Sequence, residues 1–341
     1  MSAPVLPTHT PALFERAVRE AVALLRQGEV VVLPTETVYG LAANALDPVS
    51  VQRIYSVKGR PSHNPIIVHV ASKPMLSECV AEWPEAAEQL ARAFWPGPLT
   101  LVLPKSGRIP DIVTAGGATV AVRWPQHPFM QAVILGCGFP LAAPSANLSN
   151  CLSPTTAGHV SRQLGERVPL IVDGGDCNVG IESTVVDLTS NPPRVLRPGM
   201  ISSESILATV GAGDPDVSGR IPVSGRGALK SPGLLAKHYS PRARLLLLEW
   251  KDDADLLRQL SERGIQPGTD IQVLSHGRIP MGGQFPHVNV IPHDAEAFAR
   301  GLYAELHRCD DAGARWIVVE MPPDQPLWHG ITDRLRRAAT P

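Results

Sequence analysis

The chain has 341 residues, of which 44% are hydrophobic and 18% charged, and its formal net charge is −1. This length exceeds the usual span of one hydrophobic core and favours two domains, while the composition excludes a disordered chain. A nearly neutral chain lacks the overall basic charge of a general nucleic-acid binder, so any site for a polyanion must be local.

The N-terminal segment lacks the basic and apolar regions of a secretory signal, and no apolar run is long enough to cross a bilayer. We therefore expect a cytoplasmic protein with no membrane partner. The five cysteines are scattered and never form CxxC, which argues against both a disulfide framework and a structural zinc site.

An amphipathic helix is predicted first, because Thr10 can cap it, Pro11 suits its first turn, and apolar residues recur at helical spacing until Gly28. Short apolar, β-branched runs follow, with helices such as 86–94 between some of them, and they predict a substantial sheet in an α/β or α+β domain. These predicted strands are 30–33, 66–70, 99–103, 120–122, 170–172 and 184–186.

Residues 211–241 are rich in Gly, Pro and Ser and follow neither structural period, so they predict either an interdomain tether or a functional loop. Beyond them, strand-like runs alternate with helical stretches such as 297–309, which predicts a small domain with a parallel sheet. The runs are 245–248, 271–274 and 316–320.

No phosphate-binding GxxxxGK[ST] loop or dinucleotide GxGxxG turn is present, so a nucleotide would have to be bound by a different arrangement of residues. The segment 34–70 places hydroxyls on a loop after one predicted strand, and Lys58 and Arg60 before the next. In an extended KGRP segment both cations would point to one face, with Asn64 and His69 adding neutral polar groups nearby. A solvated charge pair and a phosphate site both remain open at this point.

Two further clusters are polar. The APSANLSNCLSPTT stretch holds Ser145 and Ser153 without the GxSxG elbow of a serine nucleophile, so it is either a plain polar loop or part of a binding site. Arg123 and Arg197 end predicted strands, where a guanidinium either caps the surface or grips a carboxylate or phosphate in a cleft.

Read together, these segments resemble the YrdC-like threonylcarbamoyl-AMP synthase family in its long, two-domain form. The resemblance rests on PTETVYGL, KGRPSHNPIIVHV, FWPGPLTLVLPK, VAVRWP, APSANLS, VGIESTVVDL and VLRPG, in family order, and on SPGLLAKHYSP and ITDRLRRAA further along. Asn150 stands where the family usually has glycine after ANxS, and the linker lacks a common basic residue, which puts the local loop shape in question.

The resemblance implies an α/β catalytic domain over 1–210, with an open, twisted sheet whose concave face holds the substrates. It implies a linker over 211–241 that could act as a lid, and a Rossmann-like domain over 242–341. The implied reaction joins L-threonine, bicarbonate and ATP into threonylcarbamoyl-AMP and pyrophosphate. A downstream tRNA threonylcarbamoyl transferase complex would then use the product to modify the adenosine beside the anticodon.

The resemblance also assigns residues by motif position. The residues implied for threonine are Thr37, His69, Arg123, the backbone of Ala143, and Ser183. Those implied for ATP are Arg60, Asn64, Thr119, Ser145, Ser153, Arg197 and Tyr239, with Lys58 and Arg60 as the catalytic cations. Magnesium is expected to enter on the ATP phosphates, without protein side chains as ligands.

Two other functions compete. A double-stranded RNA-binding module is weakened by the neutral charge, although a weak contact with tRNA or double-stranded RNA stays open. A carbamoyltransferase like the YrdC-containing hydrogenase-maturation proteins would need paired CxxC zinc fingers, which this sequence lacks.

Overall fold

The computed structural model describes residues 2–211, 230–233 and 238–340, which divide into two compact units. The first comprises 2–149, 153–211 and 230–233, and the second comprises 150–152 and 238–340. Most of the predicted linker, namely 212–229 and 234–237, lies outside the described residues.

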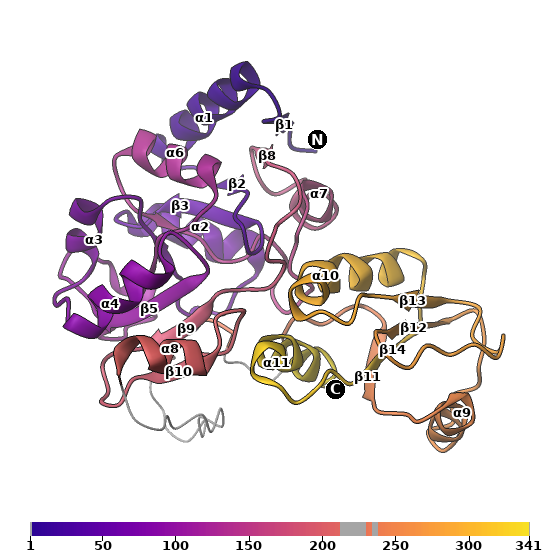
Figure 1. Ribbon diagram of the computed structural model, residues 1–341. Coiled ribbons are helices and arrows are strands. Elements are labelled where there is room, and N and C mark those ends of the chain that lie inside the picture. The colour runs from indigo at the N-terminus through magenta and orange to yellow at the C-terminus, as the bar shows by residue number, and fades with distance from the viewer. Residues whose placement is uncertain (1, 212–229, 234–237, 341) are drawn as a thin grey trace. The chain divides into compact units, whose positions relative to one another are not determined.

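A ten-stranded mixed sheet forms the centre of the first unit (Figure 1), in the order β1-β8-β2-β3-β7-β4-β6-β5-β9-β10. Its strands are β1 (Val5–Pro7), β2 (Val31–Leu33), β3 (Gly40–Asn44), β4 (Val68–His69), β5 (Leu99–Pro104), β6 (Thr119–Arg123), β7 (Leu141–Ala142), β8 (Ile171–Asp173), β9 (Thr184–Asp187) and β10 (Arg194–Arg197).

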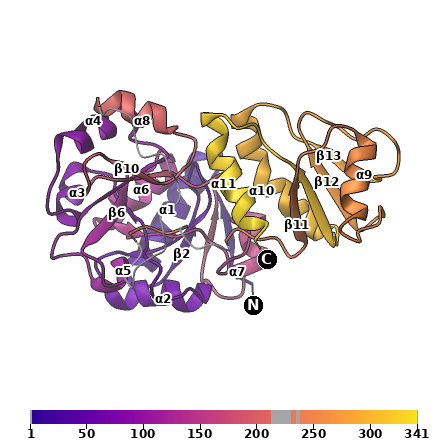
Figure 2. The same cartoon turned by 90° about the horizontal axis from the view of Figure 1, so that it is seen from below.

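Helices cover this sheet. They are α1 (Pro11–Arg26), α2 (Pro48–Lys58), α3 (Lys73–Cys79), α4 (Glu85–Phe94), α5 (Asp111–Thr114), α6 (Pro128–Cys137), α7 (Ala157–Leu164) and α8 (Ser203–Val210). Helices α1 and α6 lie side by side (Figure 1), and Phe14 meets Phe129 there with ring centroids 5.1 Å apart. Helices α2 and α5 are neighbours elsewhere in the unit (Figure 2).

The first helix follows the sequence prediction closely. The Thr10 hydroxyl accepts a hydrogen bond from the Leu13 N–H at 3.3 Å, and Pro11 occupies the first turn. The prediction of an extended KGRP segment is wrong, however. Lys58 is the last residue of α2, and Gly59 ends the helix at a φ of 59°, which a residue without a Cβ adopts at no cost.

Strand β3 was absent from the predictions, and β7 was expected only as a strand-like run that ends in Pro144. The sequence of β3 is GLAAN, whose small residues have weak intrinsic strand preference, and β7 contains only Leu141 and Ala142. Both strands exist because their neighbours supply backbone partners: β3 pairs with β2 and β7, and β7 also pairs with β4. Tertiary pairing overrides propensity here.

The second unit confirms the predicted small parallel-sheet domain. Its four strands run in the order β11-β14-β12-β13 with every pair parallel. Helices α10 and α11 lie on one face of this sheet and α9 on the other (Figures 1 and 2). Its elements are β11 (Arg244–Leu248), α9 (Asp253–Ser261), β12 (Ile271–Ser275), β13 (Val288–Val290), α10 (Ala295–Asp311), β14 (Trp316–Glu320), a 3-10 turn (Pro326–Trp328) and α11 (His329–Ala338).

Each unit contains an apolar core of its own. Val32, Leu41 and Val68 are fully buried in the first, and Leu256, Val273 and Val318 are fully buried in the second. Across the described parts of the chain, no helix is both long enough and apolar enough to span a membrane.

Gly199 supplies a test of packing beside β9. A Cβ at this position would stand 2.5 Å from the Thr184 nitrogen and 2.9 Å from the Glu182 carbonyl oxygen, closer than real Cβ atoms approach. We expect Gly199→Ala to lower the free energy of unfolding by about 1–3 kcal/mol, the usual cost of overpacking. Calorimetric unfolding would measure it, and Gly107→Ala, with nothing within 4 Å of the new Cβ, should be nearly neutral. Equal stability of the two variants would contradict this packing.

Candidate active site

The ends of neighbouring strands bring several predicted residues together. His69 and Arg123 are register partners at the carboxyl ends of the parallel strands β4 and β6. On its other side His69 faces Leu141 of β7. Ala143 follows β7 directly, and its N–H donates to the Ile67 carbonyl at 3.0 Å. Parallel strand ends and the loops after them are common positions for binding sites.

Arg123 is the most firmly held of these residues. Its Nε donates to the Gly97 carbonyl at 3.2 Å and its Nη1 to the Thr37 hydroxyl at 2.9 Å. Its Nη2 lies 2.7 Å from Glu36 Oε1, an ion pair that lacks the alignment of a hydrogen bond. Both side chains are only 4% exposed. The guanidinium is therefore oriented before any ligand arrives.

Glu36 is a site residue that the sequence reasoning missed. Burial alone would raise the pKa of its carboxyl, but the close positive charge of Arg123 and the Gln126 N–H at 3.0 Å lower the pKa below its ordinary value. Glu36 therefore stays ionised. The available signal was an acidic residue inside PTET, directly before the predicted ligand Thr37.

His69 is neutral in this environment. Burial, assisted by the nearby charge of Arg123, lowers the pKa of its imidazole to about 3. The side chain is 3% exposed, and its Nδ1 is buried with no hydrogen-bond partner. A neutral imidazole can donate or accept one hydrogen bond at this atom, depending on its tautomer.

Several buried polar atoms of predicted site residues and of Glu36 have no hydrogen-bond partner. They include Glu36 Oε2, His69 Nδ1, and both the Oδ1 and Nδ2 atoms of Asn64. Asn64 is 1% exposed, so solvent does not satisfy its amide. Because buried polar groups in folded proteins are nearly always paired, this concentration of unpaired atoms indicates groups arranged for a ligand.

Buried cations form the other half of the site. Lys58, 2% exposed, donates from Nζ to the Ser145 carbonyl at 2.6 Å and also contacts Asn147 of the APSAN loop. Arg60, 8% exposed, donates to the carbonyls of Asn64 at 3.0 Å and Pro65 at 2.7 Å. Carbonyl oxygens satisfy these donors without cancelling their charge.

A third cation lies at the end of β10. Arg197 donates to the Ser183 carbonyl through Nε at 3.1 Å and to the Ser183 hydroxyl through Nη2 at 3.0 Å. The Ser183 hydroxyl also lies 2.7 Å from that of Thr100 on β5. This network couples the end of β10 to the start of β9.

Three other predicted residues have their described positions or partners elsewhere. Thr119 begins β6, whereas Arg123 ends it, so the two are roughly 13 Å apart along the strand. Ser153 is fully buried, and its hydroxyl donates to Glu182 at 2.5 Å. Tyr239 belongs to the second unit, where the Arg334 guanidinium lies 5.4 Å from the centroid of its ring.

Within the described ranges, no group of three His, Cys, Asp or Glu side chains could hold a metal ion. The side chains predicted to bind ATP carry cationic, amide and hydroxyl groups. This donor set suits a metal brought in by phosphate oxygens rather than one held by a protein cage.

Comparisons with known proteins identify the family. Residues 23–199 match the family described as "Telomere recombination", and residues 201–340 match "Threonylcarbamoyl-AMP synthase, C-terminal domain". The chain belongs to the two-domain threonylcarbamoyl-AMP synthase family. Both the predicted family and the predicted two-part α/β architecture are thereby confirmed, and the competing RNA-binding and carbamoyltransferase interpretations lose their basis.

Relatives match along nearly the whole chain. The threonylcarbamoyl-AMP synthase of Pyrococcus abyssi is 39% identical over 329 residues, covering 95% of this chain and 94% of its own length. That of Bacillus subtilis is 40% identical, covering 94% and 92%. The crystal structure of P. abyssi Sua5 complexed with L-threonine superposes with a TM-score of 0.87 at 37% identity, covering 99% of this chain and 98% of that one.

The low pKa of His69 makes a prediction about stability. The imidazole stays neutral in the folded state down to about pH 3, whereas an unfolded histidine takes up a proton below about pH 6.5. The unfolded state therefore binds more protons in this range, and the native protein loses stability as the pH falls. His69→Gln should remove this loss, so its stability relative to the wild type should rise by about 2 kcal/mol between pH 7.5 and 5.

Denaturant titrations at the two pH values would measure this change. His63→Gln, at an exposed position, is the matched control and should keep the wild-type pH dependence. A parallel response of the wild type and His69→Gln would show that His69 is not buried in its neutral form.

Proposed function

We propose that this protein condenses L-threonine, bicarbonate and ATP into threonylcarbamoyl-AMP and pyrophosphate. The observation that carries the proposal is the buried, pre-oriented Arg123 guanidinium beside unpaired polar atoms of Glu36 and His69. The long match to curated threonylcarbamoyl-AMP synthases gives this arrangement its substrates, since P. abyssi Sua5 has been crystallised with L-threonine.

In the proposed complex, Arg123 binds the threonine carboxylate, because a planar guanidinium can donate to both carboxylate oxygens. Thr37 already accepts from Arg123 and lies next to that carboxylate position. His69, Ser183 and the backbone at Ala143 complete the threonine subsite, and the neutral His69 imidazole suits a hydroxyl better than a second charge.

The chemistry proceeds in two steps. The neutral threonine amine attacks the bicarbonate carbon, and one water leaves as N-carboxy-threonine forms. An oxygen of the new carboxylate then attacks the α-phosphorus of ATP, and the bond from that phosphorus to the pyrophosphate oxygen breaks. Both steps bring anions together, so fixed positive charge and alignment of the reactants are the main requirements.

Lys58 and Arg60 supply that charge in the proposal. Their carbonyl contacts hold both cations in place without neutralising them, as electrostatic stabilisation of a transition state requires. The proposed ATP ligands are Arg60, Asn64, Thr119, Ser145, Ser153, Arg197 and Tyr239. Magnesium bound through the ATP phosphates would add charge neutralisation there. The product would pass, in the cytoplasm, to a tRNA threonylcarbamoyl transferase complex.

The direct test is to incubate the protein with ATP, labelled bicarbonate and threonine, and to follow threonylcarbamoyl-AMP and pyrophosphate by mass spectrometry. Arg60→Ala and Lys58→Ala should each lower turnover by roughly 10² or more, the scale of removing one pre-organised charge-stabilising group. Arg19→Ala, at an exposed site on α1, should leave turnover unchanged. Normal pyrophosphate release by a folded Arg60→Ala protein would refute the assignment.

Substrate choice tests the hydroxyl-binding part of the site. Valine should be a poor substrate, because it replaces the threonine hydroxyl by a methyl group and leaves buried polar groups without a partner. Serine should be used better than valine, since it loses only a methyl contact. Measured kcat/KM values for the three amino acids decide the point, and equal values for valine and threonine would contradict it.

We also propose that the linker acts as a lid. Its residues 230–233 are attached to the first unit: Lys230 Nζ lies 2.8 Å from Asp187 Oδ2 and 2.9 Å from the Thr189 hydroxyl, and Ser231 is fully buried. The Pro232 carbonyl accepts from Arg197 at 3.4 Å, which connects this segment to a proposed ATP ligand. An ordered lid would exclude water from a hydrolysable intermediate.

Limited proteolysis of residues 211–241 would test this idea. We expect ATP together with threonine to slow cleavage at least severalfold, because closure removes the backbone from the protease. Each ligand alone is the control. Identical cleavage rates with and without both ligands would indicate a passive tether.

A further inference from the structure

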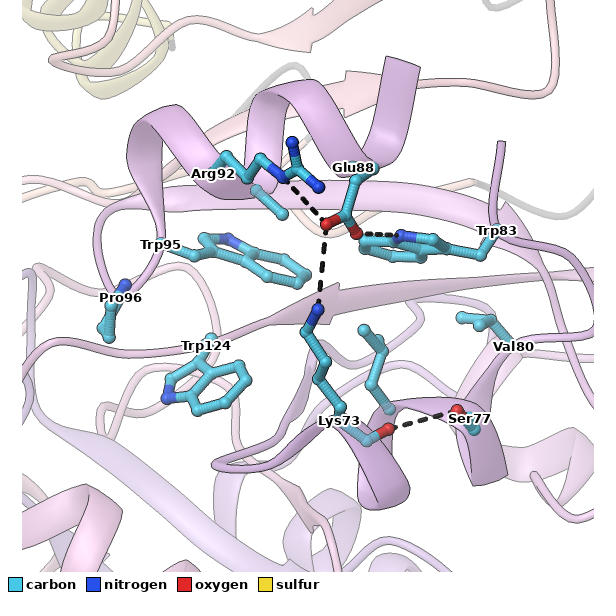
Figure 3. A pocket seen from close by; sticks show the side chains of 11 residues that line it. Lys73, Ser77, Val80, Trp83, Glu88, Arg92, Trp95, Pro96 and Trp124 are labelled. Carbon is cyan, nitrogen blue, oxygen red and sulfur yellow. Dashed lines mark hydrogen bonds and ion pairs between the residues drawn. The ribbon is translucent and has the colours of Figure 1, made fainter. Parts of the chain in front are cut away.

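A second pocket lies apart from the residues assigned to substrates. Its volume is about 460 Å³, within the range of small-molecule sites, and α3 and α4 form two of its sides (Figure 3). Three tryptophans line it, namely Trp83, Trp95 and Trp124. No residue proposed above for threonine or ATP belongs to its lining.

The indole walls are held in place. Trp83 and Trp95 lie with ring centroids 5.9 Å apart and planes tilted by 34°. Trp83 Nε1 donates to Glu88 Oε2 at 2.9 Å, and Trp95 Nε1 donates to the Leu99 carbonyl at 2.7 Å. With both N–H groups engaged, the rings offer mainly their apolar surfaces to an occupant, and aromatic surfaces favour a planar partner.

One edge of the pocket carries more positive than negative charge. Glu88 Oε1 accepts from Arg92 Nε at 3.0 Å and lies 3.7 Å from Lys73 Nζ (Figure 3). The Arg92 and Lys73 side chains are 78% and 80% exposed, so both cations can turn toward an incoming group. Two cations share one carboxylate here, which leaves a surplus of one positive charge beside the apolar walls.

The pocket shares a wall with the Arg123 environment. Trp124 directly follows Arg123, and its carbonyl accepts from the Gly97 N–H at 2.8 Å. The Gly97 carbonyl in turn accepts from Arg123 Nε. A group that displaces the Trp124 ring would therefore act on the same backbone that orients the guanidinium.

We propose that this pocket is a second small-molecule site, which binds a planar aromatic group carrying a negative charge and is coupled to threonine binding through Trp124 and Gly97. The aromatic group lies against the indole walls, and its anion meets Lys73 and Arg92. The coupling rests on the proposed function, in which Arg123 binds the threonine carboxylate, whereas the binding itself does not.

Phenylacetate, phenylacetamide and phenethylamine form a matched set of anionic, neutral and cationic probes. Three of the six tryptophans of the chain line the pocket, so intrinsic fluorescence excited at 295 nm reports occupancy. We expect saturable binding in the order phenylacetate, phenylacetamide, phenethylamine. The preference for the anion should decrease as ionic strength rises. No saturable change, or equal affinities for the three probes, would overturn the proposal.

Variants of the pocket residues test whether the probes bind in this pocket. Combined Lys73→Glu and Arg92→Glu substitutions should weaken phenylacetate about tenfold by reversing two nearby charges, and change phenylacetamide by less than about twofold. Arg19→Glu is the matched control, since Arg19 is also an exposed helical arginine facing a glutamate one turn away. Ser77→Trp, which fills the pocket from an exposed position on α3, should abolish binding of all three probes. Phenylacetate binding that survives both changes would place the probe elsewhere and overturn the assignment.

Calorimetric titration of threonine with and without saturating phenylacetate tests the coupling. Bound phenylacetate should change the threonine affinity by some factor, and bound threonine should change the phenylacetate affinity by that same factor. Ser77→Trp should remove both changes. Unchanged threonine affinity at full occupancy would refute the coupling. Absence of threonine binding without any probe would instead count against the proposed function, while the fluorescence result would stand separately.

Discussion

The buried contact between Arg123 and Glu36 is the constraint on which the candidate site depends. A guanidinium that is 4% exposed must have its charge and its donors satisfied, and Glu36, Thr37 and the Gly97 carbonyl do so from two different segments of the chain. Losing either member of such a pair leaves an uncompensated buried charge, which is strongly destabilising. The loop after β2, the turn before β5 and the end of β6 are therefore fixed relative to one another by one side chain.

The remaining buried cations have described contacts of a different kind. Lys58, Arg60 and Arg197 donate to backbone carbonyls of loops that follow strands or helices. Carbonyl dipoles compensate part of the cost of burial and hold these side chains in place. The proposed ATP site relies on these cations in place of a glycine-rich phosphate loop.

In the second unit, the carboxyl end of the sheet is occupied by a carboxylate of the chain itself. At the carboxyl end of β12, the N–H groups of His276, Gly277 and Arg278 all donate to the Glu320 carboxylate, which also accepts from Ser275. These donors lower the pKa of Glu320 against the effect of its burial. Open parallel sheets commonly bind phosphates at such an edge, but here an internal carboxylate already occupies the N–H groups. These backbone N–H groups are therefore engaged within the second unit itself.

Local signals in the sequence were sufficient to predict the family, the two α/β parts and the longer helices and strands. Thr10 and Pro11 define the start of α1, and the β-branched runs before Arg123 and Arg197 define strands that end at those residues, because capping and strand preference act between near neighbours in the chain. Strand β3, the helical end at Lys58, the ion pair to Glu36 and the tryptophan pocket arise only in the tertiary structure. Each depends on partners distant in sequence, and burial then decides which charges persist, which polar atoms stay unpaired and which indole faces remain open.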